Sequence, residues 1–439
     1  MIPRQPVPEG ARCQCPSDGG EGGVLSRIVG LKCRECSRRY PIAPNHVCEY
    51  CFGPLDVEYD YEEVASLVSR EKIAAGPKSI WRYRDLLPVE GESTVDLVAG
   101  FTPLVRAERL GAHLGLSQLY LKNDTLNPTG SFKDRVVAVA LSKGLELGIK
   151  VVSCASTGNL ANSVAAHAAK AGVDAYVFIP ADLERVKVFA TAVYGAKIVA
   201  IDGNYDDVNR LCAEITSEQP DWGFVNVNLR SFYSEGSKTL AFEVVEQLGW
   251  EYPDHVVVPV GSGSQLTKIY RGLNELHEVG LMPEPPRVRI SGAQPAGCSP
   301  VATAFNEGRD FIRPVKPSTV AKSLAIGNPA DGPYAVDIAR STGGGFGSVD
   351  DGEILDAIGL LASTEGIFAE TAGGVTIATL IQLICAGKIG RDERVVAYIS
   401  GNGLKTVEAI ESSVDTGVVI KPTLEEFEHY LQAGASKEG

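Results

Sequence analysis

The lysine at position 133 stands in the run Asn127-Pro-Thr-Gly-Ser-Phe-Lys-Asp-Arg, where a glycine-containing loop is predicted to open a helix. A lysine near a helix N-terminus meets unfavourable dipole charge, and partial burial also favours the uncharged amine. A free amine is the group that Schiff-base chemistry needs. Taken alone, this lysine beside Asp134 and Arg135 is more readily interpreted as an exposed residue of an amphipathic helix.

Three further short loops each follow a predicted strand: Ser156–Asn159, Gly261–Gln265 and Ser400–Gly403. At the first, the amides of a helix N-terminus can bind a carboxylate while side chains reach a ring oxygen. At the second, close glycines let amides approach a single small phosphate, although the loop is neither a Walker A motif nor a dinucleotide fingerprint. At the third, a hydroxyl could meet a cofactor edge. Each loop alone is typical of an ordinary strand-to-helix turn, but together with the lysine they indicate a cofactor site.

Four of the ten cysteines form two pairs with zinc-ligand spacing. Cys33-x2-Cys36 is followed, after eleven residues, by Cys48-x2-Cys51. Two such turns facing each other give a tetrahedral shell of four thiolates, which is the closed geometry of a structural zinc site. A reduced cluster without metal, or a ribbon that has lost its ion, is the alternative. The remaining six are interpreted as a surface pair, Cys13 and Cys15, and as small buried side chains, Cys154, Cys212, Cys298 and Cys385.

A parallel α/β architecture is predicted around these loops, because segments rich in Val, Ile and Tyr alternate with apolar patterns of helical period. Two wound α/β units are expected. Residues 295–350, which are rich in Pro, Gly and Ser, are predicted to form long connections over the sheet. The main predicted strands are 118–124, 150–155, 175–180, 196–202, 255–260, 287–293 and 393–400.

Length, charge and hydropathy exclude several classes of protein. A chain of 439 residues, 44% of them hydrophobic and 22% charged, is expected to form two or three folded domains. The formal charge of −14 opposes binding to nucleic acids or anionic membranes through the whole surface. No apolar run approaches about 18 residues, and the N-terminus lacks a signal-peptide pattern. We therefore expect a soluble cytoplasmic protein with a small-molecule substrate, and neither nucleic acid nor membrane as a partner.

Five motifs follow one another along the chain: NPTGSFKDR, STGN, the glycine-rich loop after VVVPV, AKSLAIGNPADGPYA at 321–335, and ISGNGLKT at 399–406. Together they resemble threonine synthase, and the resemblance covers nearly the whole chain from about residue 30. It implies an α/β fold of two wound domains in the tryptophan synthase β-like architecture. This is fold type II of the pyridoxal-phosphate enzymes, here preceded by a small zinc ribbon.

The resemblance also implies a division into domains. Residues 1–60 would form the four-cysteine zinc ribbon and an extension. Residues 61–140 and 236–439 would form the large domain that binds pyridoxal phosphate, and residues 141–235 a smaller α/β domain that closes over the active site. The expected cofactors are pyridoxal 5'-phosphate and a structural zinc ion, and a homodimer is expected because dimers are common in this fold type.

Residue roles follow from the resemblance motif by motif. Lys133 resembles the catalytic lysine that holds the cofactor as an internal aldimine and then moves protons. Asn159 matches the residue at the cofactor's ring oxygen, and Ser400 matches the hydroxyl at its pyridine nitrogen. Ser156 and Thr157 lie in the loop that binds the substrate carboxylate. The cofactor phosphate is expected on the phosphate loop, which consists of Gly261, Ser262, Gly263, Ser264 and Gln265.

The chain departs from the family pattern near the substrate phosphate. Many threonine synthases place an arginine three residues before the glycine of an EGxKT motif, and here that position is Tyr233. Arg230 or Lys238 could restore the positive charge as substrate-binding residues, and both are equally well interpreted as surface charges. The phosphate loop reads Gly-Ser-Gly-Ser-Gln instead of GNAGN, and Glu370-Thr-Ala-Gly-Gly replaces the commoner Glu-Pro-Ala-Ser.

The expected activity is that of a carbon–oxygen lyase. O-phospho-L-homoserine and water would give L-threonine and phosphate through the aldimine of Lys133. One alternative is another pyridoxal-phosphate enzyme that eliminates or replaces a group at the β or γ carbon, such as a threonine dehydratase or a specialised amino-acid synthase. A different class of alternative is a non-catalytic protein whose ribbon recruits a partner, against which the intact Lys133 argues.

Overall fold

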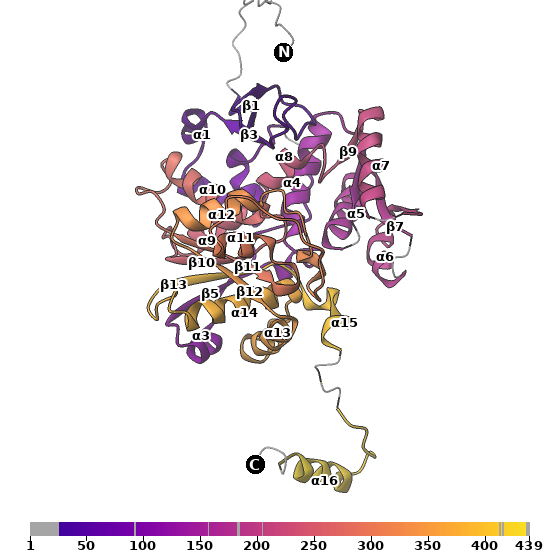
Figure 1. Ribbon diagram of the computed structural model, residues 1–439, viewed down its shortest axis with the longest axis vertical. Coiled ribbons are helices and arrows are strands. Elements are labelled where there is room, and N and C mark those ends of the chain that lie inside the picture. Colours follow the sequence, from indigo (N-terminus) through magenta and orange to yellow (C-terminus); the bar gives the residue numbers. More distant parts are fainter. Residues whose placement is uncertain are drawn as a thin grey trace, which may run out of the picture.

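The strands described by the computed structural model form three sheets with helices packed around them (Figure 1). The structure describes residues 26–91, 94–156, 158–181, 185–203, 205–411, 414 and 417–435. Three residues named above, Thr157, Cys13 and Cys15, lie outside the described residues, as does the extension before residue 26.

The largest sheet has six strands in the order β12-β11-β10-β13-β5-β4. Five of these strands run parallel, and β4 at one edge runs antiparallel to β5. Its strands are β4 (Leu104–Arg106), β5 (Gln118–Asn123), β10 (His255–Pro259), β11 (Arg289–Pro295), β12 (Phe346–Val349) and β13 (Arg394–Ile399).

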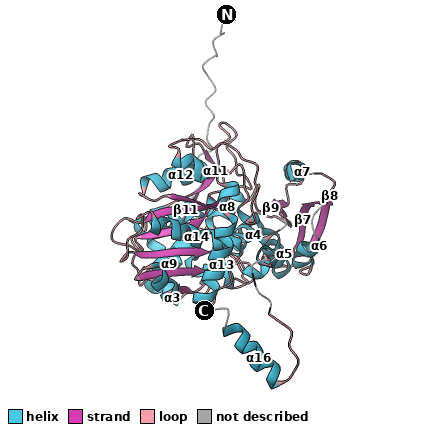
Figure 2. Cartoon of the chain, turned by 60° about the horizontal axis from the view of Figure 1, so that its bottom comes forward, coloured by secondary structure: helices cyan, strands magenta, loops and turns pink. Residues whose placement is uncertain are grey.

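Helices cover both faces of this sheet (Figure 2), because the side chains of each strand alternate between the faces. Val256 and Val258 of β10 pack in one hydrophobic cluster with Leu266, whereas Val257 packs in another with Val375. Burial on both faces explains the unbroken apolar run of β10. The surrounding helices are α3 (Glu108–Leu114), α9 (Lys238–Gln247), α10 (Ser264–Glu278), α11 (Pro300–Asn306), α12 (Gly332–Ser341), α13 (Asp351–Glu365) and α14 (Thr371–Cys385).

A second sheet, beside the first in Figure 1, has four parallel strands in the order β8-β7-β6-β9. Its helix α5 ends at Gly172, whose φ of 68° is a left-handed conformation that favours glycine. The strands are β6 (Val151–Ala155), β7 (Asp174–Pro180), β8 (Lys197–Ile201) and β9 (Trp222–Phe224). The helices are α4 (Lys133–Glu146), α5 (Asn159–Ala171), α6 (Arg185–Ala192), α7 (Tyr205–Glu218) and α8 (Arg230–Glu235).

The predicted parallel α/β architecture is confirmed, and each strand predicted above begins and ends within two residues of a strand in the structure. The prediction of long connections over 295–350 is wrong, because this stretch contains α11, α12 and β12. The physical reason is that Pro300 and Pro333 lie in the first turns of α11 and α12, where a missing N–H costs no hydrogen bond, so these prolines begin helices. The domain boundaries inferred from the resemblance stay predictions.

A three-stranded antiparallel sheet carries the clustered cysteines, in the order β2-β1-β3. Cys33 is the last residue of β1, and buried and partly exposed side chains alternate along β3. Two helices then lead toward the larger sheets. These elements are β1 (Ile28–Cys33), β2 (Arg39–Tyr40), β3 (Leu55–Tyr59), α1 (Tyr61–Leu67) and α2 (Arg70–Ala75).

The other described cysteines divide by burial. Cys154, Cys212 and Cys298 are buried, as predicted. The prediction is wrong for Cys385, which is exposed because it is the last residue of α14 and lies where that helix leaves the core.

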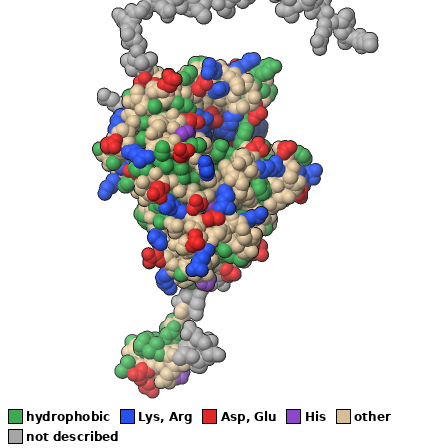
Figure 3. All heavy atoms as spheres, turned by 90° about the vertical axis from the view of Figure 1, so that its left-hand side faces the viewer, with side chains coloured by type: hydrophobic (Ala, Val, Ile, Leu, Met, Phe, Trp, Pro, Cys, Tyr) green, Lys and Arg blue, Asp and Glu red, His purple; other side chains and the backbone are tan. Residues whose placement is uncertain are grey.

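Two short helices at the C-terminal end are α15 (Val407–Ile410) and α16 (Leu424–Ala435), and α16 stands apart from the rest of the chain in Figures 1 and 2. Leu424, Phe427 and Leu431 are exposed on it, and Figure 3 shows hydrophobic side chains gathered there. Over the body of the molecule, the same view shows acidic and basic side chains interspersed. None of the described helices combines the length and apolar character that crossing a bilayer requires. The 3-10 helices are η1 (Ile80–Leu86), η2 (Asp124–Leu126), η3 (Ala296–Cys298), η4 (Lys322–Leu324) and η5 (Gly403–Lys405).

A buried cluster of charges joins β5, α4 and α9. Arg135 Nε donates to Asp124 Oδ2 at 2.7 Å, and its Nη2 donates to Glu243 Oε2 at 2.8 Å. Lys122 Nζ lies 2.6 Å from the same Glu243 oxygen. Burial by itself would raise the pKa of Glu243, but the positive charges of Arg135 and Lys122 outweigh it and lower that pKa to about 2. Ionised Glu243 therefore stabilises the first turns of α4.

We expect Glu243→Gln to lower the free energy of unfolding by about 3–5 kcal/mol near neutral pH, because it leaves buried cations without their carboxylate. The stabilisation by ionised Glu243 is complete above the ordinary pKa of 4.5 and is lost as the pH falls toward about 2. The difference between the two proteins should therefore shrink over that interval, as followed by urea unfolding and circular dichroism. Glu251→Gln is the control, since Glu251 is 61% exposed and pairs with Arg394 at the surface. A gap between Glu243→Gln and wild type that is the same at every pH would contradict this account.

Candidate active site

Three of the four loops predicted to carry chemistry follow neighbouring parallel strands of the six-stranded sheet, and the fourth, Ser156–Asn159, follows β6 of the second sheet. β10, β13 and β5 are adjacent in the six-stranded sheet, in a register that pairs His255 with Val395 and Arg394 with Gln118. The phosphate loop follows β10, and Ser400 follows β13. Because the carboxyl ends of adjacent parallel strands meet at one edge of a sheet, these loops lie together there.

The loop before Lys133 is fixed on two sides. Phe132 N donates to Ser400 O at 2.9 Å, which joins this loop to the end of β13. The carboxylate of Asp134 accepts hydrogen bonds from Thr129 N and Thr129 Oγ1, both at 2.7 Å. Lys133, the first residue of α4, therefore follows a residue that is hydrogen-bonded to Ser400.

The amine of Lys133 faces α8. Its Nζ donates to the hydroxyl of Tyr233 at 3.0 Å and lies 4.5 Å from the ring centroid of Phe132. The side chain is half-buried between helices that border the second sheet. The lysine thus reaches the space between α4 and α8 with one hydrogen-bond partner that is itself a potential proton carrier.

Three polar side chains meet beside the start of α5. Asn159 Nδ2 donates to Glu370 Oε2 at 2.8 Å, and Ser400 Oγ donates to Glu370 Oε1 at 3.4 Å. Burial raises the pKa of Glu370 above its ordinary value, against the opposing hydrogen bond from Asn159. The structure therefore brings the predicted residues Asn159 and Ser400 together through a carboxyl group that retains a proton more readily than an exposed one.

The phosphate loop begins α10. Gly263 has a φ of 95°, and a Cβ atom built on it would lie 2.7 Å from the carbonyl oxygen of Asp331, so the loop requires glycine here. Gln265 is buried, and its Nε2 has no hydrogen-bond partner among the described residues. The first amides of a helix have no partner within the helix and favour a negative charge. The loop can therefore receive a phosphate.

The similarity of this chain to known proteins identifies the cofactor of its family. Residues 95–401 match the family described as pyridoxal-phosphate dependent enzyme. The chain is 41% identical to threonine synthase of Methanocaldococcus jannaschii, over 86% of this chain and 93% of that protein. The chain belongs to the pyridoxal-phosphate-dependent threonine synthases. Threonine synthase of Mycobacterium tuberculosis is 40% identical, over 75% of this chain and 89% of that protein.

Solved structures of related enzymes show the same fold. Threonine deaminase isoform 2 of Solanum lycopersicum superposes with a TM-score of 0.58 over 71% of this chain and 87% of that one, at 22% identity. Maize serine racemase gives a TM-score of 0.58 over 71% and 92%, at 21% identity. The predicted fold, the tryptophan synthase β-like fold type II, is confirmed.

The residues at these strand ends fit pyridoxal phosphate. The loop before Lys133 is hydrogen-bonded to the end of β13, an amide and a hydroxyl meet at Glu370, and a glycine-rich loop opens a helix at the end of the neighbouring strand β10. The unpaired Nε2 of Gln265 is a buried donor that a bound phosphate-bearing group would satisfy. The residues of this chain that would hold the cofactor are thus Lys133, Asn159, Ser400 and those of the phosphate loop.

The predicted substrate-binding residues differ from one another in burial and in the groups that they contact. Ser156 is half-buried directly after β6, in the loop that opens α5. Arg230 is 29% exposed, and its Nη2 donates to Asp331 Oδ2 at 2.6 Å. Lys238 is fully buried, with Nζ 2.6 Å from Glu235 and 2.8 Å from Glu275. The structure therefore does not bring Lys238 to the site, and it is not a surface charge either.

Three residues at or next to the site had no role assigned from the sequence: Tyr233, Glu370 and Asp331. The first two stand in segments where the sequence departs from the family pattern. Asp331 lies in the 321–335 motif, which contributed to the resemblance but suggested no chemistry. A pairing between distant carboxylates and arginines leaves no signal in the spacing of residues along one chain.

We expect Gly263→Ala to weaken pyridoxal-phosphate binding by about tenfold or more, since left-handed backbone costs a residue with a Cβ about 1–2 kcal/mol. The new methyl group would also press on Asp331 O. The dissociation constant can be followed by cofactor absorbance. Gly280→Ala is the control, because Gly280 has a φ of 74° just beyond the other end of α10 and open space around its Cβ position. Equal cofactor affinity in the two variants would contradict a phosphate site at this loop.

Proposed function

We propose that this protein is a threonine synthase that converts O-phospho-L-homoserine and water to L-threonine and phosphate with pyridoxal phosphate. The observation that carries the proposal is the position of Lys133, whose amine donates to Tyr233 and whose loop is hydrogen-bonded to the backbone of Ser400. Ser400 in turn shares the carboxyl group of Glu370 with Asn159. The names of its relatives, which match over most of the chain, support the same reaction.

Pyridoxal phosphate, when bound, supplies an electron sink for the charge left when a proton is removed beside the substrate's amino group. Lys133 is the chain's own base, since its amine can accept that proton and return one at the neighbouring carbon. Tyr233 fixes the amine by accepting its hydrogen bond at 3.0 Å. Glu370 holds the amide of Asn159 in one orientation, so the amide presents a constant polar edge to the site.

The substrate's two anionic groups would be bound at different helices. The loop at Ser156 opens α5, whose N-terminal amides suit the substrate carboxylate. For the substrate phosphate we favour Arg230 over Lys238. Arg230 is partly exposed and pairs with one carboxylate, whereas Lys238 is fully buried between two.

Phosphate release from O-phospho-L-homoserine, with identification of the amino-acid product, tests this function. We expect threonine to form in step with phosphate, and Lys133→Ala to lower turnover by about a thousandfold or more because the base is lost. Lys150→Ala is the control, since Lys150 is 78% exposed and lies at the opposite end of β6 from Ser156. Formation of 2-oxobutanoate from threonine, without phosphate release, would instead identify a threonine dehydratase.

We also propose a structural zinc ion in the ribbon. The thiol sulfurs of Cys33 and Cys51 lie 3.4 Å apart, and those of Cys36 and Cys48 lie 3.6 Å apart. All four sulfurs lie within 4.8 Å of one another. Ligands about 2.3 Å from a central zinc would be roughly 3.8 Å apart in a tetrahedron, so the cluster fits that ion with no position left for substrate.

Replacing Cys33 and Cys48 together by serine should abolish stoichiometric zinc and lower the melting temperature, because metal binding contributes directly to folding of such modules. Plasma mass spectrometry of the purified protein gives the metal content, and circular dichroism gives the melting temperature. Cys385→Ser, at an exposed thiol far from the cluster, should change neither. Zinc content that is unaffected by the double substitution would contradict the site.

The homodimer, the cytoplasmic location and the closure of residues 141–235 over the site stay predictions. The amino-acid class of the substrate agrees with the family.

A further inference from the structure

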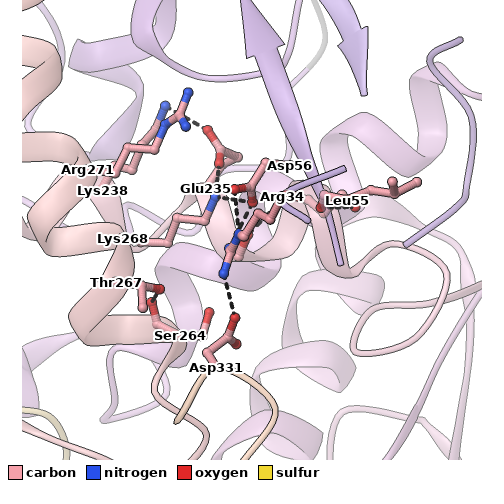
Figure 4. Close-up of polar contacts among 12 residues, drawn as sticks. Arg34, Leu55, Asp56, Glu235, Lys238, Ser264, Thr267, Lys268, Arg271 and Asp331 are labelled. Atoms are coloured by element: carbon pink, nitrogen blue, oxygen red, sulfur yellow. Dashed lines mark hydrogen bonds and ion pairs between the residues drawn. The ribbon is translucent and has the colours of Figure 1, made fainter. Parts of the chain in front are cut away.

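The ribbon and the phosphate loop are joined by one arginine. Arg34 lies between Cys33 and Cys36, and its guanidinium uses both edges (Figure 4). Nε and Nη2 donate to the two carboxylate oxygens of Asp56 at 2.6 and 2.9 Å, and Nη1 donates to Asp331 Oδ1 at 2.8 Å. One planar fork thus holds two carboxylates, a task for which a single ammonium group has the wrong shape.

The position of Arg34 is further restricted by aromatic contact. Its guanidinium carbon lies 4.8 Å from the ring centroid of Tyr334, and the Tyr334 hydroxyl donates to Glu35, the next residue of the cysteine turn. The Arg34 side chain is 17% exposed and that of Asp331 is 3% exposed. Because the pair is largely shielded from water, its attraction is stronger than that of a surface ion pair.

Asp331 in turn packs against the phosphate loop. Its backbone N donates to Ser262 O at 2.9 Å. Its carbonyl oxygen lies where a Cβ on Gly263 would be only 2.7 Å away. Asp331 therefore packs against two successive residues of the phosphate loop, Ser262 and Gly263, and a shift of Asp331 would move that loop.

A second connection reaches the helix that this loop opens. Lys268 of α10 donates from Nζ to Asp56 Oδ1 at 2.9 Å, so Asp56 is shared between the ribbon's arginine and the helix (Figure 4). Arg34 is thus joined to the phosphate loop through Asp331 and to its helix through Asp56 and Lys268. The ribbon contacts both structures that the cofactor phosphate would need.

We propose that Arg34 is a positioning residue for the cofactor phosphate: through Asp331 it sets the geometry of Gly261–Gln265, so that the cysteine ribbon contributes to pyridoxal-phosphate affinity. This inference rests on the proposed function, since it takes the phosphate loop as the cofactor's phosphate site. A merely structural Arg34 would anchor the ribbon and influence stability without changing how the loop binds phosphate.

The test measures the dissociation constant of pyridoxal phosphate by equilibrium dialysis of the full chain, together with the ³¹P NMR signal of the bound cofactor. We expect Arg34→Ala and Asp331→Ala each to weaken binding by about tenfold and to shift the phosphorus signal. In the Asp331→Ala background, Arg34→Ala should weaken binding much less than it does in the wild-type protein, because only the connection through Asp56 and Lys268 is left to lose.

Arg39→Ala is the matched control, because Arg39 belongs to the same module but is 67% exposed and pairs with Glu58 at the surface. It should leave affinity and phosphorus signal unchanged. Arg34→Lys keeps the positive charge and is the variant to test if Arg34→Ala does not fold. It should also weaken cofactor binding, since one ammonium group cannot replace the planar guanidinium that binds two carboxylates. Zinc content and melting temperature are measured for every variant.

Wild-type cofactor affinity and an unchanged phosphorus signal in a folded, zinc-loaded Arg34 variant would overturn the inference while leaving the proposed function intact. Additive weakening in the double variant would overturn the route through Asp331. A wild-type protein that does not bind pyridoxal phosphate would overturn the proposed function and this inference with it.

Discussion

The geometry of the site depends on the ion pairs that the buried guanidinium of Arg135 makes. It holds Asp124, directly after β5, and Glu243 of α9, so the first turn of α4 cannot move without separating charges in the protein interior. Lys133 lies on that same turn, two residues earlier. Because any displacement would leave several buried charges unpaired, the position of the lysine amine is restricted far more than that of a lysine on a surface helix.

Around this fixed lysine, some buried polar groups have hydrogen-bond partners and others do not. Asn159 and Ser400 share Glu370, whereas the buried Nε2 of Gln265 has no partner among the described residues. A buried donor without an acceptor costs free energy, and a ligand that supplies the acceptor removes this cost. A phosphate-bearing cofactor bound there would therefore stabilise the folded state, as expected for a ligand that binds the native state alone.

The sequence predicted those features that are encoded by neighbouring residues. The apolar run of β10, the glycines of the phosphate loop and the spacing of Cys33, Cys36, Cys48 and Cys51 all act over short distances, and the structure places them as expected. The helices in 295–350 were missed because proline was interpreted as a breaker where it begins a helix. The pairing of Arg34 with Asp331 spans 297 positions, and the burial of Lys238 depends on Glu275, so neither leaves a local pattern.

Tyr233 stands where the resemblance to threonine synthases implies an arginine, and positive charge lies close by on the same helix. Residues 230 and 233 are three apart on α8, so Arg230 places a guanidinium on the same face of that helix as Tyr233. The Arg230 guanidinium belongs to a connected network of ion pairs among the described residues. This network contains five cationic side chains and four carboxylates, so the cations outnumber the carboxylates by one. Its members are Arg34, Arg230, Lys238, Lys268 and Arg271, with Asp56, Glu235, Glu275 and Asp331. Arg230 is partly exposed and pairs with Asp331, whose backbone is hydrogen-bonded to the phosphate loop. Under the proposed function, its positive charge would attract the substrate phosphate, while the Lys133 amine is hydrogen-bonded to the hydroxyl of Tyr233 and not placed against a second cation.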